Sequence, residues 1–140
     1  MHFDDLRSLS TALFLFPQAM IAEPEEVPPK MAFIAPAASL AAAASNRFYA
    51  TDNYYSWIFG MLLRYDLADC VAAIASNAQH QSKVLIVGPV DEMHVPLPAD
   101  AVTETYKFAS TQAGGSLTVI PGDYSESEAA QEVLGWLANH

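Results

Sequence analysis

The segment that most constrains the fold is the apolar run from Lys83 to Gly88, which reads Lys-Val-Leu-Ile-Val-Gly. Aliphatic and β-branched residues follow one another there without alternating with polar ones, and this pattern is typical of a strand buried on both faces. Such strands belong to parallel sheets that are covered by helices on each face. The run therefore predicts an α/β protein whose sheet lies between layers of helices.

A second strand is predicted at Ser116–Ile120, where a short apolar run ends at Pro121-Gly122. The segment between the two strands has apolar residues at helical spacing, namely Ala101, Val102, Thr105, Tyr106 and Ala109. Ser125 or Ser127 can cap a final helix, whose expected apolar face is formed by Ala129, Val133, Leu134 and Leu137. Because a helix crosses between the strands, the strands should run parallel.

Residues 1–79 have a different pattern, rich in alanine, methionine and aromatic residues at helical spacing, and we predict a mainly helical, lid-like region there. The expected helices run from Asp4 or Asp5 to Phe16, over Met31–Ala44 with a break or start at Pro36, from Thr51 or Asp52 to Tyr65, and from Asp66 to about Ala78. An acidic, proline-rich connector, Glu23–Pro29, joins the first two. Residues 80–140 form the second region, with the order strand, helix, strand, helix.

Two parallel strands are too few for a stable sheet, since three or more are generally needed. The strand at Lys83–Gly88 is also too apolar to lie at an edge exposed to water. Three explanations are open. Either Ala12–Phe16 or Met31–Ile34 is a strand rather than a helix, or the missing strands come from another chain, or the sequence is a truncated domain, the C-terminal portion of a larger α/β unit. We favour the truncated domain.

Charge and hydropathy restrict the classes of partner. Six lysines and arginines oppose sixteen aspartates and glutamates, for a formal net charge of −10, and this disfavours nucleic-acid binding because phosphate contacts need a basic surface. No uninterrupted apolar stretch reaches the roughly 18 residues that span a membrane. The acidic start, Met1-His2-Phe3-Asp4-Asp5, is unlike a signal peptide. We therefore expect a cytoplasmic protein that binds neither nucleic acid nor membrane.

Cys70 is the single cysteine, so the chain has no internal disulfide and no cysteine-based zinc site. It lies in an apolar helical segment, where a free cysteine usually packs as a small hydrophobic residue rather than acting as a nucleophile. The sequence also lacks a glycine-rich phosphate loop, paired histidines at helical spacing and an aspartate-rich calcium loop. No cofactor and no metal are expected.

The order of elements from Asp66 to Leu137 is a helix, the buried strand, the acidic loop Asp91-Glu92 before Pro96, a helix, a strand ending at Pro121-Gly122, and a last helix. This order resembles the C-terminal portion of an α/β-hydrolase. The stretch from Asp52-Asn53-Tyr54-Tyr55 to Arg64-Tyr65-Asp66 is similar to the passage from lid to core in homoserine O-acetyltransferases. The resemblance implies a partial α/β-hydrolase fold and, for an intact member, acyl transfer or hydrolysis of a small acyl ester.

In that family a triad of serine, histidine and an acid performs the chemistry, and the acid follows a strand of this kind. The family's usual spacing before the proline places the acid at Glu92. A shift of one residue selects Asp91, which is the commoner residue type, and both stay candidates for the catalytic acid. The alternative is that both are solvated loop acids without a catalytic role.

The base and the nucleophile of such a triad are missing. A histidine should follow the second strand, but Pro121-Gly122 is followed by Asp123-Tyr124-Ser125, and a tyrosine, with an ordinary pKa of about 10, is a poor base near neutral pH. His94 lies in the acidic loop and could be recruited as a base, but we expect a surface histidine without a role there. The pentapeptide Gly-x-Ser-x-Gly does not occur.

These observations predict an α/β-hydrolase-like protein of the acyltransferase or esterase type that is inactive alone, with an N-terminal half-domain or further copies of itself as partner. The alternative is a small, non-catalytic α/β binding or interaction module that acts as a homo-oligomer. An aromatic group in the lid-like region could line a binding pocket, although packing of the lid on the sheet is its plainer use. The group consists of Phe48, Tyr49, Tyr54, Tyr55, Trp57 and Phe59.

Overall fold

The computed structural model describes residues 30–46, 61–77 and 82–139. The described elements are β1 (Lys30–Ile34), α2 (Leu40–Ser45), the 3-10 helix η3 (Met61–Leu63), α3 (Leu67–Ser76), β2 (Lys83–Val87), α4 (Ala99–Ala113), the 3-10 helix η4 (Gly114–Ser116), β3 (Leu117–Ile120) and α5 (Glu126–Asn139). The predicted helix from Asp4 or Asp5 to Phe16, the aromatic group and most of the predicted helix that ends at Tyr65 lie outside the described residues. Only the end of that last helix is described, as η3.

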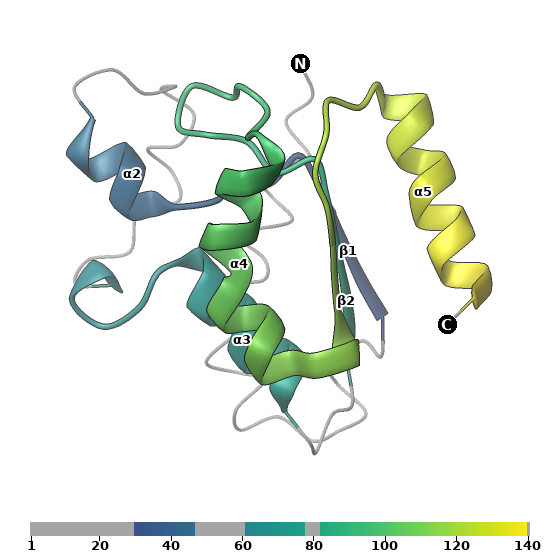
Figure 1. Cartoon of the computed structure of the whole chain (residues 1–140), viewed down its shortest axis with the longest axis horizontal. Coiled ribbons are helices and arrows are strands. Elements are labelled where there is room, and N and C mark those ends of the chain that lie inside the picture. The colour runs from purple at the N-terminus through teal and green to yellow at the C-terminus, as the bar shows by residue number, and fades with distance from the viewer. Residues whose placement is uncertain (1–29, 47–60, 78–81, 140) are drawn as a thin grey trace.

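Three parallel strands form one sheet in the order β1-β2-β3. Lys30 to Ile34 pair with Lys83 to Val87, and Val84 to Val87 pair with Leu117 to Ile120. α3 and α4 cover one face of the sheet, and α5 lies on the other (Figure 1). The structure thus confirms a mixed α/β architecture, with the two predicted parallel strands and the helix that connects them.

β1 shows that Met31–Ile34 is a strand, which confirms one of the alternatives left open, and that a helix starting at Met31 is wrong. Only the second half of the segment Met31–Ala44 is helical, as the six-residue α2, while Lys30–Ile34 is a strand. Methionine and alanine favour helices, but intrinsic propensity is a weak determinant of structure, and pairing with β2 overrides it here. Pro36 adds to this, because the residue before a proline is disfavoured in the helical region. The sheet therefore contains three strands, and one of them comes from the region that we expected to be helical.

The central strand β2 divides its side chains between two hydrophobic cores. Val84 and Ile86 face the core that the sheet forms with α3 and α4, while Leu85 and Val87 face the core beneath α5. All four are at most 1% exposed, and burial of such a side chain contributes roughly 1.5–3 kcal/mol. The lack of alternation in the sequence is thereby explained, since both faces of this strand are covered.

The sheet-facing row of α5 differs from the row that the sequence indicated. Ala129 and Trp136 are buried and Val133 packs beside them. Leu134 and Leu137 were expected on this face, but they are 66% and 41% exposed. The spacing of 129, 133 and 136 is as regular as the predicted one, and this row buries the large Trp136 in place of the two leucines.

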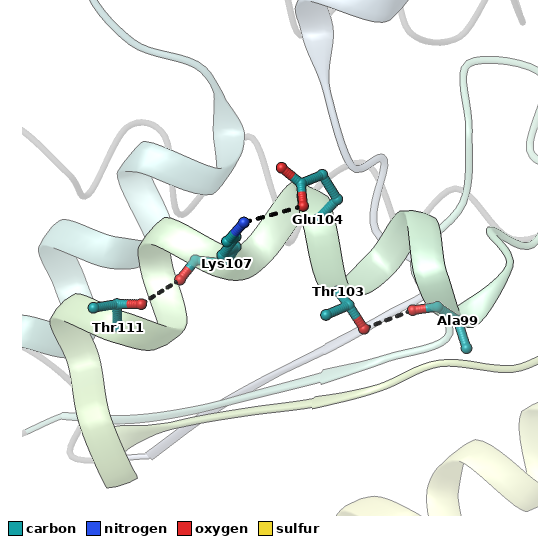
Figure 2. A network of polar contacts seen from close by, with 5 residues as sticks. All are labelled: Ala99, Thr103, Glu104, Lys107 and Thr111. Carbon is teal, nitrogen blue, oxygen red and sulfur yellow. Dashed lines mark hydrogen bonds and ion pairs between the residues drawn. The ribbon is translucent and has the colours of Figure 1, made fainter.

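α4 has an apolar face toward the sheet and α3, and a polar face toward solvent. On the polar face the hydroxyls of Thr103 and Thr111 each donate to the carbonyl oxygen one turn earlier, at 2.8 Å, and Lys107 lies 3.5 Å from Glu104 (Figure 2). α4 has 15 residues. Within the three described ranges, no helix is long and apolar enough to cross a membrane.

Candidate functional site

The carboxyl ends of the three parallel strands form the candidate site, because ligands of open α/β sheets bind in the crevice beyond those ends. The chain leaves β1 at Ala35, which has a φ of 48°, and leaves β2 at Gly88, which has a φ of 58°. Hydrogen bonds continue across the strand ends. The amide of Ala35 donates to the carbonyl of Val87 at 2.8 Å, and that of Gly88 donates to Ile120, also at 2.8 Å. The three loops therefore start from a rigid base.

The loop after β2 contains both candidate acids, and hydrogen bonds to Asp91 hold the turn of this loop. Oδ1 of Asp91 accepts hydrogen bonds from the amides of Met93 and Val95, at 2.8 and 2.9 Å. The amide of Asp91 donates to the carbonyl of Val95 at 2.9 Å, and its carbonyl accepts from the amide of His94 at 3.1 Å. One carboxylate oxygen is thus used to hold the turn that the loop makes, as short polar side chains commonly do in turns.

Glu92 points to a different partner from Asp91. Its Oε1 accepts a hydrogen bond from Nδ2 of Asn46, the residue that caps the C-terminus of α2. The structure therefore brings the two acids into one loop but directs one carboxylate to the loop's own backbone and the other to α2. Sequence reasoning missed Asn46, and no spacing rule connects positions so far apart in the chain.

His94 lies at the turn of this loop. It is half-buried and adopts a left-handed backbone conformation with a φ of 61°, a region in which histidine is several-fold enriched among non-glycine residues. Its amide closes the turn on Asp91. The structure thus gives His94 a backbone role in the shape of the loop, which the sequence did not indicate.

Tyr124 fills the position after β3 where the family resemblance would require a histidine. Its ring lies against two glycines, so that a Cβ atom on Gly88 would be 3.2 Å from Cδ2 of the ring and one on Gly122 would be 2.8 Å from Cε2. The hydroxyl donates to the carbonyl of Pro121 at 3.4 Å. The aromatic ring therefore covers the carboxyl ends of β2 and β3, and the glycines that precede it are the sequence signal for this close approach.

Cys70 is buried in α3, as the sequence predicted. Burial, together with the nearby negative charges of Asp69 and Asp66, raises the pKa of its thiol to about 12. The nucleophilic form of cysteine is the thiolate, and at neutral pH this side chain holds its proton. The structure therefore makes Cys70 part of the hydrophobic core.

Asp66 joins the N-termini of two helices. Its carboxylate accepts from the amides of Leu40 and Ala41 at the start of α2, at 2.8 and 3.2 Å, and from the amide of Leu67 at the start of α3, at 2.8 Å. The hydroxyl of Ser39 donates to the same carboxylate at 2.5 Å. Asp66 was predicted to start the second of these helices, and its contact with α2 was not foreseen. Negative charge at a helix N-terminus is favourable, so this acid has a structural role.

Two further observations concern metal ligands and similarity to known proteins. Among the residues that the structure describes, no three side chains of the histidine, cysteine, aspartate or glutamate type are grouped so as to hold a metal ion. Comparisons of the chain with protein-family models, with curated proteins and with solved structures give no match. The function of the site must therefore be argued from its own geometry.

Proposed function

We propose that this chain has the C-terminal part of an α/β-hydrolase-like fold, similar to that of homoserine O-acetyltransferases, and no acyltransferase or esterase activity by itself. The order of the described elements supports the fold. A buried strand is followed by an acidic loop, a helix, a second strand ending at Pro121-Gly122 and a last helix on the opposite face. In this proposal the acid of the loop, Asp91 or Glu92, corresponds to the triad acid of that family.

The packing of Tyr124 is the observation that carries the inactivity. A triad needs its base within hydrogen-bond reach of the acid and of the nucleophile. At the end of β3 the ring of Tyr124 packs on Gly88 and Gly122, and its hydroxyl faces the carbonyl of Pro121. Loss of the serine or the histidine removes nearly all of a triad's contribution to the rate. The contacts of the two loop acids also support this, because Oδ1 of Asp91 accepts from the amides of its own loop and Glu92 accepts from Asn46.

Hydrolysis of p-nitrophenyl acetate tests this proposal. We expect no saturable rate above that of buffer, and the same result for Asp91→Asn. The asparagine variant keeps an Oδ1 acceptor for the loop while removing the carboxylate, so it changes the chemistry without removing the turn. A saturable rate that falls by about tenfold or more in Asp91→Asn would contradict the proposal, because it would make Asp91 part of a working site.

A second candidate function is a non-catalytic interaction module. It is favoured by β1, whose outer edge has no partner strand among the described residues. A variant of the first proposal supplies the missing serine and histidine from a separate N-terminal half-domain. Mixing the two polypeptides would then produce esterase activity that neither has alone, and an interaction module would show none.

A further inference from the structure

The outer edge of β1 presents a regular set of main-chain groups. Successive residues of a strand direct their N–H and C=O groups to opposite sides, and the amide of Ala35 donates to Val87 of β2. The groups of Lys30, Ala32 and Ile34 therefore point away from β2. Within the described part of the chain, β1 pairs with β2 alone. An edge of this kind is a template for pairing with another strand.

An uncharged row on α5 lies beside this edge. The residues that face the sheet are Ala129, Val133 and Trp136, and α5 packs over β2 and β1 (Figure 1). α5 runs from the carboxyl ends of the strands toward their amino ends, and a right-handed helix turns by about 100° per residue. The residues that follow the sheet-facing ones by one position therefore lie on the side of α5 nearest β1. Together with Ser127, they form a row of exposed residues, namely Ser127, Ala130, Leu134 and Leu137.

We propose that a second copy of this chain pairs with the β1 edge about a two-fold axis through Ala32. The two β1 strands then run antiparallel, with Ala32 opposite Ala32 of the second copy and Lys30 opposite Ile34. The outward groups of residues 30, 32 and 34 match one another in this register, so each of these pairs can exchange both of its main-chain hydrogen bonds. The result is a continuous six-stranded sheet, with three strands from each copy.

Charge and shape favour a second copy as the occupant. A two-fold axis perpendicular to the sheet places both α5 helices on the same side, antiparallel, with Leu134 and Leu137 of each facing the other. No charged residue lies in this row, although the chain has a net charge of −10. An interface between identical copies must be complementary to itself, and an uncharged row meets this requirement.

Lys30 supplies a complementary charge at each end of the interface. It lies on the α5 face of the sheet, where its Nζ donates to the carbonyl of Leu137 at 3.4 Å. The antiparallel arrangement brings it toward the carboxyl end of the second copy's β1, where that copy's α5 begins with the exposed acids Glu126 and Glu128. The dimer needs no catalytic site, so this inference stands independently of the proposed function.

Sedimentation equilibrium of the full chain tests the dimer, with variants at two exposed apolar residues. We expect a mass of twice 15.1 kDa for the wild type and a concentration-dependent shift to monomer for Leu134→Lys. Phe108→Lys is the matched control, because Phe108 on α4 is 59% exposed, similar to Leu134 at 66%, and lies away from β1. Circular dichroism confirms that each variant is folded.

Sedimentation equilibrium of Lys30→Glu tests the contribution of the Lys30 charge to the interface. Lys107→Glu on the polar face of α4 serves as control. We expect the dissociation constant to rise by about tenfold in Lys30→Glu and to be unchanged in Lys107→Glu. A monomeric wild type would overturn the proposal and would indicate that the rest of the chain or another protein covers the edge. Dissociation by Phe108→Lys but not by Leu134→Lys would overturn it as well, since the dimer would then use α4.

Discussion

Gly88 is the residue on which the candidate site depends most. A φ of 58° suits glycine, and a Cβ atom at this position would lie 2.9 Å from the carbonyl oxygen of Gly122. The adjacent backbone cannot move away freely, because the amide of Gly88 is bonded to Ile120. The backbone at the end of β2 therefore requires a residue without a Cβ atom at position 88.

We predict that Gly88→Ala lowers the free energy of unfolding by about 2–3 kcal/mol, through backbone strain and the close contact with Gly122. Urea denaturation measures it. Gly135→Ala is the matched control, because a Cβ there meets nothing within 4 Å and the residue lies inside α5. It should raise the free energy of unfolding by about 0.5–1 kcal/mol. Equal effects of the two substitutions would show that the contact is not as described.

Ser125 and Glu128 form a reciprocal cap at the start of α5. The hydroxyl and the amide of Ser125 donate to Oε2 of Glu128, at 2.6 and 2.9 Å. These bonds hold the pKa of Glu128 below its ordinary value. A carboxyl group with a lowered pKa stabilises the folded state above its unfolded pKa, and this contribution is lost as the pH falls through the folded pKa.

The pH dependence is checked with Ser125→Ala. We expect the pKa of Glu128 to rise part of the way to its ordinary value, because the hydroxyl donor is lost while the amide donor remains. An NMR titration of the Glu128 side-chain carboxyl carbon measures it. Ser127→Ala, which removes a neighbouring hydroxyl, should leave the pKa of Glu128 low. A low pKa in both variants would show that the hydroxyl bond does not cause the shift.

At the scale of elements, Asp66 links α2 to α3. It is the N-cap of α3 and also accepts hydrogen bonds from the first amides of α2, whose own N-cap is Ser39. We predict that Asp66→Ala lowers the free energy of unfolding by about 2 kcal/mol, since the loss of an N-cap costs about 0.5–2 kcal/mol and the hydrogen bonds to α2 are lost with it. Asp66→Asn should cost less than Asp66→Ala, because asparagine keeps one of the two acceptor oxygens. Thermal or urea unfolding measures both. Similar losses in the two variants would contradict this, since the acceptor oxygen that asparagine keeps would then contribute nothing.

Elements with a strong local pattern could be predicted from the sequence, and those decided by distant contacts could not. β2 was evident because Val84–Val87 is apolar throughout. Met31–Ile34 was left open between helix and strand because its residues fit both, and only pairing with Lys83–Val87 makes it a strand. On α5, Ala129 and Val133 were assigned correctly to the buried face, but Trp136 lies there in place of Leu134 and Leu137.

In the candidate site, too, the local pattern predicted the positions of residues but not their contacts. The sequence placed Asp91 and Glu92 in the loop after the buried strand, and the structure has them there. It could not show that Oδ1 of Asp91 holds its own loop or that Glu92 contacts Asn46. Their roles as triad acids stay a prediction, because side-chain direction depends on loop geometry that no spacing rule contains.

At the scale of the whole molecule, the third strand changes what we expect of stability. Two strands alone would make an incomplete domain, whereas three parallel strands with helices on both faces can fold cooperatively. The edge of β1, which has no partner strand among the described residues, and the exposed leucines of α5 are the surfaces that the proposed second copy covers.

Thermal unfolding by circular dichroism, at protein concentrations about a hundredfold apart, tests this account most directly. We expect one sharp transition whose midpoint rises with concentration, because association stabilises the folded state by mass action. A sharp transition with a constant midpoint would contradict the dimer. A broad, non-cooperative transition would contradict the three-stranded core itself.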